Sequence, residues 1–129
     1  ALRGGGLTAP AIHDADTLPL DAVMAAMRDL AGRARAGRLR GSELADPTIT
    51  VSSIGDRGAE EMIAVVIPPQ VAVVAFGAPQ ERPWVSGGAV VPRTLVRVTL
   101  SADHRVSDGR IGSRFLMDLE RHLAKPEAL

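Results

Sequence analysis

The sequence "LSADHRVSDGRIGSRFL", residues 100–116, contains the end of one predicted element and the start of the next. From residue 95 to 103 apolar and polar residues alternate, which is the period-two pattern of a β-strand. From Gly109 to Ala124 apolar residues recur at helical spacing, and Pro126 ends the pattern; the stripe consists of Ile111, Phe115, Leu116, Leu119 and Leu123. The stretch therefore predicts a strand, a turn and a helix.

His104 lies at the end of this predicted strand and, in the period-two alternation, falls on the same side as the apolar side chains. If the strand extends that far, the imidazole points toward the core. A histidine suits proton transfer near neutral pH, and Asp108 four positions later could orient it or neutralise charge. Asp108 is equally suited to be the N-cap of the helix that begins at Gly109. Spacing alone leaves both interpretations open.

Toward the N-terminus, residues 19–36 have the apolar spacing of a helix, with Thr17 as candidate N-cap and Gly37 as the C-terminal stop. Residues 6–12 are apolar and strand-like. The order strand, helix, several strands, helix indicates an α/β fold.

Two further strands are predicted in the middle of the chain. Residues 48–55 are rich in β-branched side chains. Residues 71–78 form a continuous apolar run, which predicts a strand that is covered on both faces. Gly87 and Gly88 mark the tip of a loop or short hairpin.

The composition of the 129 residues is that of one globular domain, with 46% hydrophobic residues and fifteen charges of each sign. Nucleic acid is not an expected partner, because there is no net positive charge and aromatic residues make up 2% of the chain. The chain has no cysteine, so disulfides, thiolate metal sites and a cysteine nucleophile are excluded. No membrane span is expected, and a cytoplasmic location fits.

Residues Asp103 to Gly109 resemble the Asp-His-Arg-x-x-Asp-Gly signature of the dihydrolipoamide acyltransferases, the core component of 2-oxo acid dehydrogenase complexes. The related chloramphenicol acetyltransferases share a looser His-x-x-x-Asp-Gly version. Further blocks occur in family order over nearly all of the chain; they are "GLTAPAIHDAD" (6–16), "RARAGRLRGSEL" (33–44), "TITVSSIGDRG" (48–58) and "VIPPQVAVVAFGAPQERP" (66–83). The chain departs from the family pattern at Ser53, Ile67 and Arg110.

The resemblance implies a role for three residues. His104 would be the general base that takes a proton from a thiol, and Ser52 would donate a hydrogen bond to the oxyanion of the tetrahedral intermediate. Asp108 would hold the His104 loop in shape. Without the resemblance, Ser52 and Ser53 read as ordinary strand-end hydroxyls, and His13 and His122 as surface residues. Coenzyme A would be a substrate, the lipoyl group would be carried on a separate domain, and no metal would be needed.

The fold implied by the resemblance is a two-layer α/β sandwich of the chloramphenicol acetyltransferase type, with a mixed sheet covered by helices. Residues 1–129 would be the C-terminal part of that catalytic domain, so we expect a longer polypeptide. The family implies homotrimers that assemble into a cage, with His104 facing Ser52 of a neighbour. The implied partners are the 2-oxo acid decarboxylase and dihydrolipoamide dehydrogenase components.

Three functions remain open at this point. The first is an acyltransferase that moves an acetyl, succinyl or branched-chain acyl group between dihydrolipoyl and coenzyme A. The second is a catalytically silent structural core that binds partner enzymes. The third is an acetyltransferase for a free small molecule, which the Asp-His-Arg motif favours less.

Overall fold

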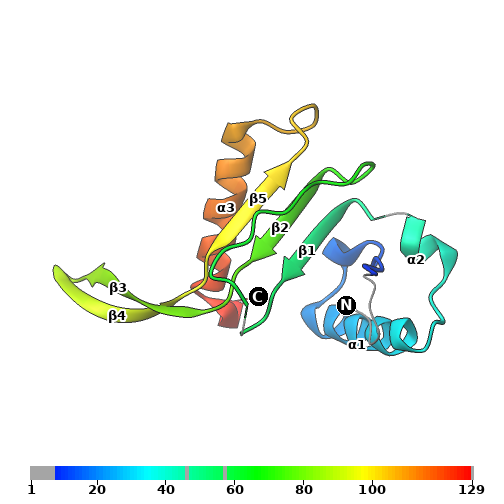
Figure 1. Ribbon diagram of the computed structural model, residues 1–129, viewed down its shortest axis with the longest axis horizontal. Helices are drawn as coiled ribbons and strands as arrows, with labels where there is room; N and C mark the ends of the chain where they lie inside the picture. The colour runs from blue at the N-terminus through cyan, green and yellow to red at the C-terminus, as the bar shows by residue number, and fades with distance from the viewer. Residues whose placement is uncertain (1–7, 46, 57, 129) are drawn as a thin grey trace. The chain divides into compact units, whose positions relative to one another are not determined.

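The chain forms two compact units, one up to Thr48 and the other from Ile49 to Ala128. The computed structural model describes residues 8–45, 47–56 and 58–128. Figure 1 labels the helices and strands of both units.

The first unit is helical, with the short 3₁₀ helix η1 (Ala15–Thr17), α1 (Leu20–Arg35) and α2 (Gly41–Ala45). The predicted helix is confirmed, but the prediction that Thr17 caps it is wrong. Pro19 occupies the N-cap position, and the Thr17 hydroxyl donates to the Asp14 carbonyl at 2.8 Å. The reason is local: a residue before proline avoids helical backbone angles, and Leu18 is extended with φ −94° and ψ 140°.

The end of α1 is where the sequence places it. Gly37 has a φ of 66°, a left-handed conformation that glycine adopts without a steric penalty. The Arg38 N–H donates to the Arg33 carbonyl at 2.9 Å, and the Gly37 N–H donates to the Ala34 carbonyl at 3.1 Å. These two bonds form a Schellman motif, which stops the helix.

Glu43 joins the parts of the first unit. Its carboxylate is buried and accepts two hydrogen bonds from the Arg33 guanidinium, at 2.7 and 2.6 Å, and one from the Arg40 N–H at 2.7 Å. The Arg33 bonds, followed by the Arg40 bond, lower the pKa of Glu43 to about 2. The Glu43 carbonyl accepts from the Ala11 N–H at 2.7 Å. Residues 8–12 are nevertheless not in a strand, since the described backbone there has no strand partner.

The second unit contains a mixed sheet of three strands in the order β1-β2-β5, where β1 and β2 are parallel and β2 and β5 are antiparallel. The strands are β1 (Ile49–Ser53), β2 (Ala72–Phe76) and β5 (Val98–Ala102). The side chains of residues 72–75 on the central strand are buried, and Ala75 is 0% exposed. The predicted apolar strand is therefore confirmed as the core of this unit.

The helix α3 (Gly109–Leu123) covers one face of this sheet, which gives the two layers seen in Figure 1. A Cβ on Gly112 would lie 3.3 Å from Cδ2 of Leu100, so Leu100 faces the helix. Residues paired across neighbouring strands point to the same face. Thr99 therefore points to the opposite face, where its hydroxyl donates to the Met62 carbonyl at 2.5 Å.

The apolar stripe predicted for α3 is only partly covered by the described residues. Leu116 and Leu119 are half-buried. Ile111, Phe115 and Leu123 are exposed by 53%, 39% and 52%. The helix is thus as long as predicted, but its contacts with β5 bury only one side of the stripe.

The predicted hairpin is present and longer than expected, because β3 (Gln80–Ser86) and β4 (Ala89–Leu95) have seven residues each. Gly87 and Gly88 form its turn with φ values of 59° and 81°, as a two-residue hairpin turn requires. Pro83 and Pro92 lie opposite each other in the register.

A close backbone approach fixes the chain after β2. The Ala78 N–H donates to the Ala59 carbonyl and the Gly77 N–H to the Arg97 carbonyl, both at 2.9 Å. A Cβ on Gly77 would lie 1.8 Å from the carbonyl oxygen of Glu60. Only glycine fits at this position.

Candidate active site

His104 lies in a tight turn and not in the strand. β5 ends at Ala102, and residues 104–106 form the turn. The N–H groups of Val106 and Ser107 both donate to the Asp103 carbonyl, at 2.9 and 3.0 Å. The condition for an inward-pointing imidazole, a strand that extends to residue 104, is therefore not met: His104 lies just beyond the strand, and its side chain is exposed.

Asp103 organises this turn, a role that we did not predict. Its Oδ1 accepts a hydrogen bond from the Arg105 backbone N–H at 2.9 Å. The Arg105 guanidinium donates through Nε to Oδ1 at 3.0 Å and to Oδ2 at 3.1 Å, and through Nη2 to Oδ2 at 2.6 Å. The side-chain bonds from Arg105, followed by its backbone bond, lower the pKa of Asp103 to about 2. An Asp that bonds the backbone N–H two residues later is a known turn signal. That signal is present in the sequence.

Asp108 caps α3. Its Oδ1 accepts the Ile111 N–H at 2.8 Å, and its backbone is extended with φ −115° and ψ 173°. The N-cap interpretation is confirmed. The carboxylate makes no hydrogen bond to residues 103–107, all of which are described. The role in shaping the His104 loop that the family resemblance implies for Asp108 stays a prediction.

Ser52 lies on β1 opposite Ala75 of β2, which in turn lies opposite Thr99 of β5. Ser52 is half-buried and shares the sheet face of Thr99, away from α3. The neighbouring Ser53 has a different role, because its hydroxyl accepts the Gly55 N–H at 3.2 Å. Of the two hydroxyls, Ser53 is thus the one that satisfies a turn at the strand end.

Ser52 and His104 do not meet within one chain. Ser52 is level with Thr99, and the last residue of β5, Ala102, is three residues further along the sheet. With about 3.3 Å per residue and about 4.8 Å between strands, the Cα atoms of Ser52 and Ala102 are about 14 Å apart. His104 lies beyond Ala102. Figure 1 shows the same separation: β1 runs toward one end of the sheet, while β5 leads into its turn at the other end.

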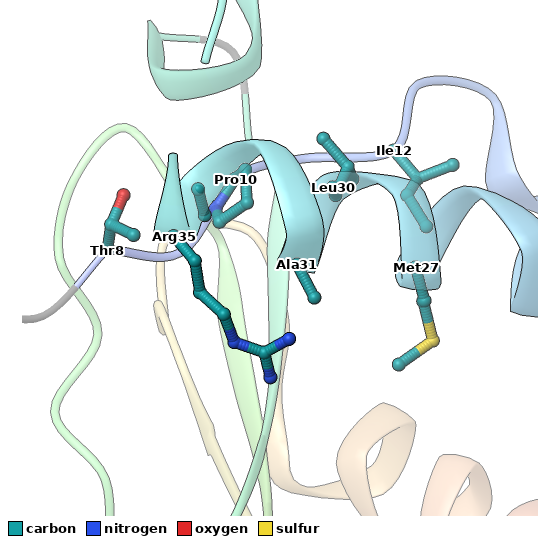
Figure 2. Close-up of a pocket in the computed structure, with 8 residues that line it drawn as sticks. Thr8, Pro10, Ile12, Met27, Leu30, Ala31 and Arg35 are labelled. Carbon is teal, nitrogen blue, oxygen red and sulfur yellow. The ribbon is translucent and has the colours of Figure 1, made fainter. Parts of the chain in front are cut away.

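The cavity in the first unit is a separate feature (Figure 2). It has a volume of about 310 Å³ and lies between α1 and the segment before η1. None of the three predicted site residues lines it. Its lining is apolar except for Thr8 and Arg35, and consists of Thr8, Pro10, Ile12, Met27, Leu30, Ala31, Ala34 and Arg35.

His13 and His122 are exposed, as expected. Within residues 8–45, 47–56 and 58–128, no group of three acidic or histidine side chains could hold a metal ion. No helix in this part of the chain is long and apolar enough to cross a membrane.

Comparison with known proteins gives consistent matches. The family model described as 2-oxoacid dehydrogenases acyltransferase (catalytic domain) matches residues 3–129. A dihydrolipoyllysine-residue acetyltransferase component of the pyruvate dehydrogenase complex from Zymomonas mobilis is 38% identical over 122 residues, which are 95% of this chain and 28% of that protein. A probable dihydrolipoyllysine-residue succinyltransferase component of the 2-oxoglutarate dehydrogenase complex from Schizosaccharomyces pombe is 36% identical over 94% of this chain and 27% of that protein. The chain thus spans between a quarter and a third of these relatives.

Solved structures match over about half of their length. A probable dihydrolipoamide acetyltransferase from Listeria monocytogenes has a TM-score of 0.87 and 30% identity, covering 95% of this chain and 52% of that one. The cubic core of a pyruvate dehydrogenase multienzyme complex has a TM-score of 0.86 and 32% identity, covering 95% and 51%.

A dihydrolipoamide acetyltransferase from Azotobacter vinelandii matches with the same TM-score, 0.86, and the same identity, 32%, over 95% of this chain and 51% of that one. Its structure was investigated for the role of one serine, one histidine and one asparagine in the catalytic mechanism. In that enzyme the histidine follows the serine by 52 positions, and the asparagine follows the histidine by four.

Proposed function

This chain belongs to the family of 2-oxoacid dehydrogenase acyltransferase catalytic domains, and from this membership we propose that it transfers an acyl group between dihydrolipoyl and coenzyme A. His104 is the general base and Ser52 the oxyanion donor. The chain is part of the catalytic domain of a longer protein, since it spans about half of the solved relatives.

One observation carries the assignment of the site. Ser52, His104 and Asp108 have the same two sequence separations as the serine, histidine and asparagine investigated in the Azotobacter enzyme. Asp108 therefore stands where that enzyme has asparagine. Both residues are good N-caps, so the hydrogen bond to the Ile111 N–H is compatible with either.

The reaction follows from these side chains. His104 accepts the proton of the attacking thiol, and the thiolate adds to the carbonyl carbon of the thioester. The oxyanion that forms accepts a hydrogen bond from the Ser52 hydroxyl. When the intermediate collapses, the carbon–sulfur bond to the leaving group breaks, and the departing thiolate takes the proton from His104. No covalent enzyme nucleophile is required.

The site lies between two copies of the chain in this proposal. The sheet keeps Ser52 of one copy about 14 Å from the end of β5, so a histidine from a neighbouring copy has to complete the site. The family resemblance implies a trimer, and we infer that each of its three equivalent interfaces forms one site. Assembly of trimers into a cage is supported by the cubic core of the solved relative. The decarboxylase and dihydrolipoamide dehydrogenase partners and the cytoplasmic location stay predictions.

The test is thiol-to-thiol acyl transfer by the full-length protein, with dihydrolipoamide and acetyl-, succinyl- and branched-chain acyl-coenzyme A. The donor that is used identifies the acyl group. We expect His104→Ala to lower the rate by about 10²–10⁴-fold and Ser52→Ala by about 10²–10³-fold.

His122→Ala and Ser53→Ala are matched controls, because they remove the same side chains at exposed positions outside the site. Both should keep the wild-type rate. If a correctly assembled wild-type protein transfers no acyl group from any donor, the acyltransferase proposal is wrong and the structural-core function replaces it.

A further inference from the structure

We propose that Asp103 is a positioning residue, which fixes the direction of the His104 imidazole by holding Arg105 across the turn. The inference rests on the proposed function, in which His104 is the base. It assigns to Asp103 a part in catalysis that touches neither substrate nor thiol.

His104 lies between the two ends of a clamp, which Asp103 and Arg105 form. The carboxylate of Asp103 holds both the backbone N–H and the guanidinium of Arg105, while its carbonyl accepts the N–H groups of Val106 and Ser107. The backbone on either side of His104 is thereby fixed. Because the backbone determines the direction of the Cα–Cβ bond, the clamp also sets the direction in which the His104 side chain leaves the backbone.

Apart from the Asp103 carboxylate, this turn is held by backbone hydrogen bonds: the Val106 and Ser107 N–H groups donate to the Asp103 carbonyl, and the Asp103 N–H donates to the Val71 carbonyl at 2.9 Å. The His104 side chain is exposed, and no described residue donates a hydrogen bond to its imidazole or accepts one from it. Asp108, the other acidic residue near it, uses its carboxylate to cap α3. The geometry of the base therefore depends on the bonds of Asp103.

A small displacement of the His104 imidazole is expected to lower the rate of acyl transfer. A general base must lie about 2.6–3.2 Å from the proton it removes, and a misplacement of about 1 Å can cost ~10²-fold in rate. In the proposed assembly His104 also has to reach a site on another copy. If the turn could change its direction, His104 would no longer reach that site even though the chain stayed folded.

The two side chains of the clamp differ in their exposure to solvent. The Arg105 side chain is 81% exposed and that of Asp103 18% exposed. Because the guanidinium is open to solvent, its ion pair with the largely covered carboxylate contributes only modestly to the free energy of unfolding. Breaking the clamp should therefore lower catalysis without a matching loss of folded protein.

The experiment uses the full-length protein and measures kcat, KM, thermal stability and assembly for Asp103→Ala, Asp103→Asn and Arg105→Lys. Asp103→Ala removes every side-chain bond of the clamp, and we expect kcat to fall about 10–100-fold with KM within about twofold of wild type. Asp103→Asn keeps an oxygen for the Arg105 N–H, and Arg105→Lys keeps the charge but loses the two-nitrogen contact. Both should retain more activity than Asp103→Ala.

Asp118→Ala is the control, because Asp118 pairs with Arg121 on α3 in an ion pair of the same type, whose carboxylate is 40% exposed and whose guanidinium is 77% exposed. It should leave kcat unchanged. Equal activity of Asp103→Ala and wild type would overturn the proposal, as would a loss of kcat that tracks a loss of stability or assembly. If wild type is active and His104→Ala equally so, the proposed mechanism fails instead, which is a distinct result.

Discussion

Mixing two inactive variants tests whether the site is shared between copies. Within one chain the sheet separates Ser52 from the end of β5 by about 14 Å, and His104 lies further away still. A Ser52→Ala copy still supplies a histidine, and a His104→Ala copy still supplies a serine. Assemblies that contain both variants should therefore form some complete sites.

The recovered activity is expected to equal the fraction of interfaces that contain both intact side chains. In randomly mixed assemblies with equal amounts of the two variants, about one quarter of the interfaces pair an intact His104 with an intact Ser52, so about a quarter of the wild-type rate should return. Each variant alone should have about 1% or less of that rate. The mixture should thus be at least tenfold more active than either variant.

The assay is acyl transfer by co-expressed full-length variants that carry different affinity tags and are purified over both. The control is a mixture of variants that were assembled separately and cannot exchange copies, which should show no recovery. A co-assembled mixture with only the mean activity of the two variants would refute the shared site, because that result requires Ser52 and His104 to act within one chain.

Three further predictions concern stability, each measured by urea unfolding followed by circular dichroism. Gly77→Ala should lower the free energy of unfolding by about 2–4 kcal/mol, because its Cβ would lie 1.8 Å from the Glu60 carbonyl oxygen. Gly112→Ala is the control and should change that free energy little, because its Cβ would lie 3.3 Å from a flexible leucine methyl group. Asp108→Ala should cost about 1 kcal/mol through the lost N-cap, while Asp108→Asn should be neutral. The folded-state pKa of Glu43 is lowered to about 2, so its ionised form stabilises the first unit above the unfolded value of about 4.3, and this contribution should disappear as pH falls from about 5 to 2. Glu43→Gln should flatten that part of the pH profile; an unchanged profile would contradict the role of Arg33.

Most of the fold could be predicted from patterns that are local in the sequence. The run at residues 71–78 indicated a buried strand because such a run needs cover on both faces, and β2 is the centre of the sheet. Gly87 and Gly88 predicted a turn because it requires positive φ values. The errors also have local causes: Pro19 displaced the expected cap at Thr17, and the Asp103 turn ended the strand before His104.

The site was harder to predict, because its geometry depends on strand register. The motif around His104 and the strand serine at Ser52 were identified from the family resemblance. Their separation follows only from the pairing of β1 with β2 and of β2 with β5. The role of Asp103 corresponds to a shorter pattern than the His104–Asp108 spacing, an Asp two residues before the backbone N–H from which it accepts a hydrogen bond.

The paired prolines of the β3–β4 hairpin disfavour the pairing of its outer edges with strands of other chains. Pro83 and Pro92 have no N–H, so they can only form a non-hydrogen-bonded pair, whose backbone nitrogens point outward along both edges of the hairpin. Each outer edge therefore lacks a donor in its middle. A strand of another chain that pairs with this edge loses one hydrogen bond at that gap, which disfavours the pairing. The hairpin can thus extend into solvent with exposed valines, such as Val90 at 70%, without becoming a template for β-sheet growth.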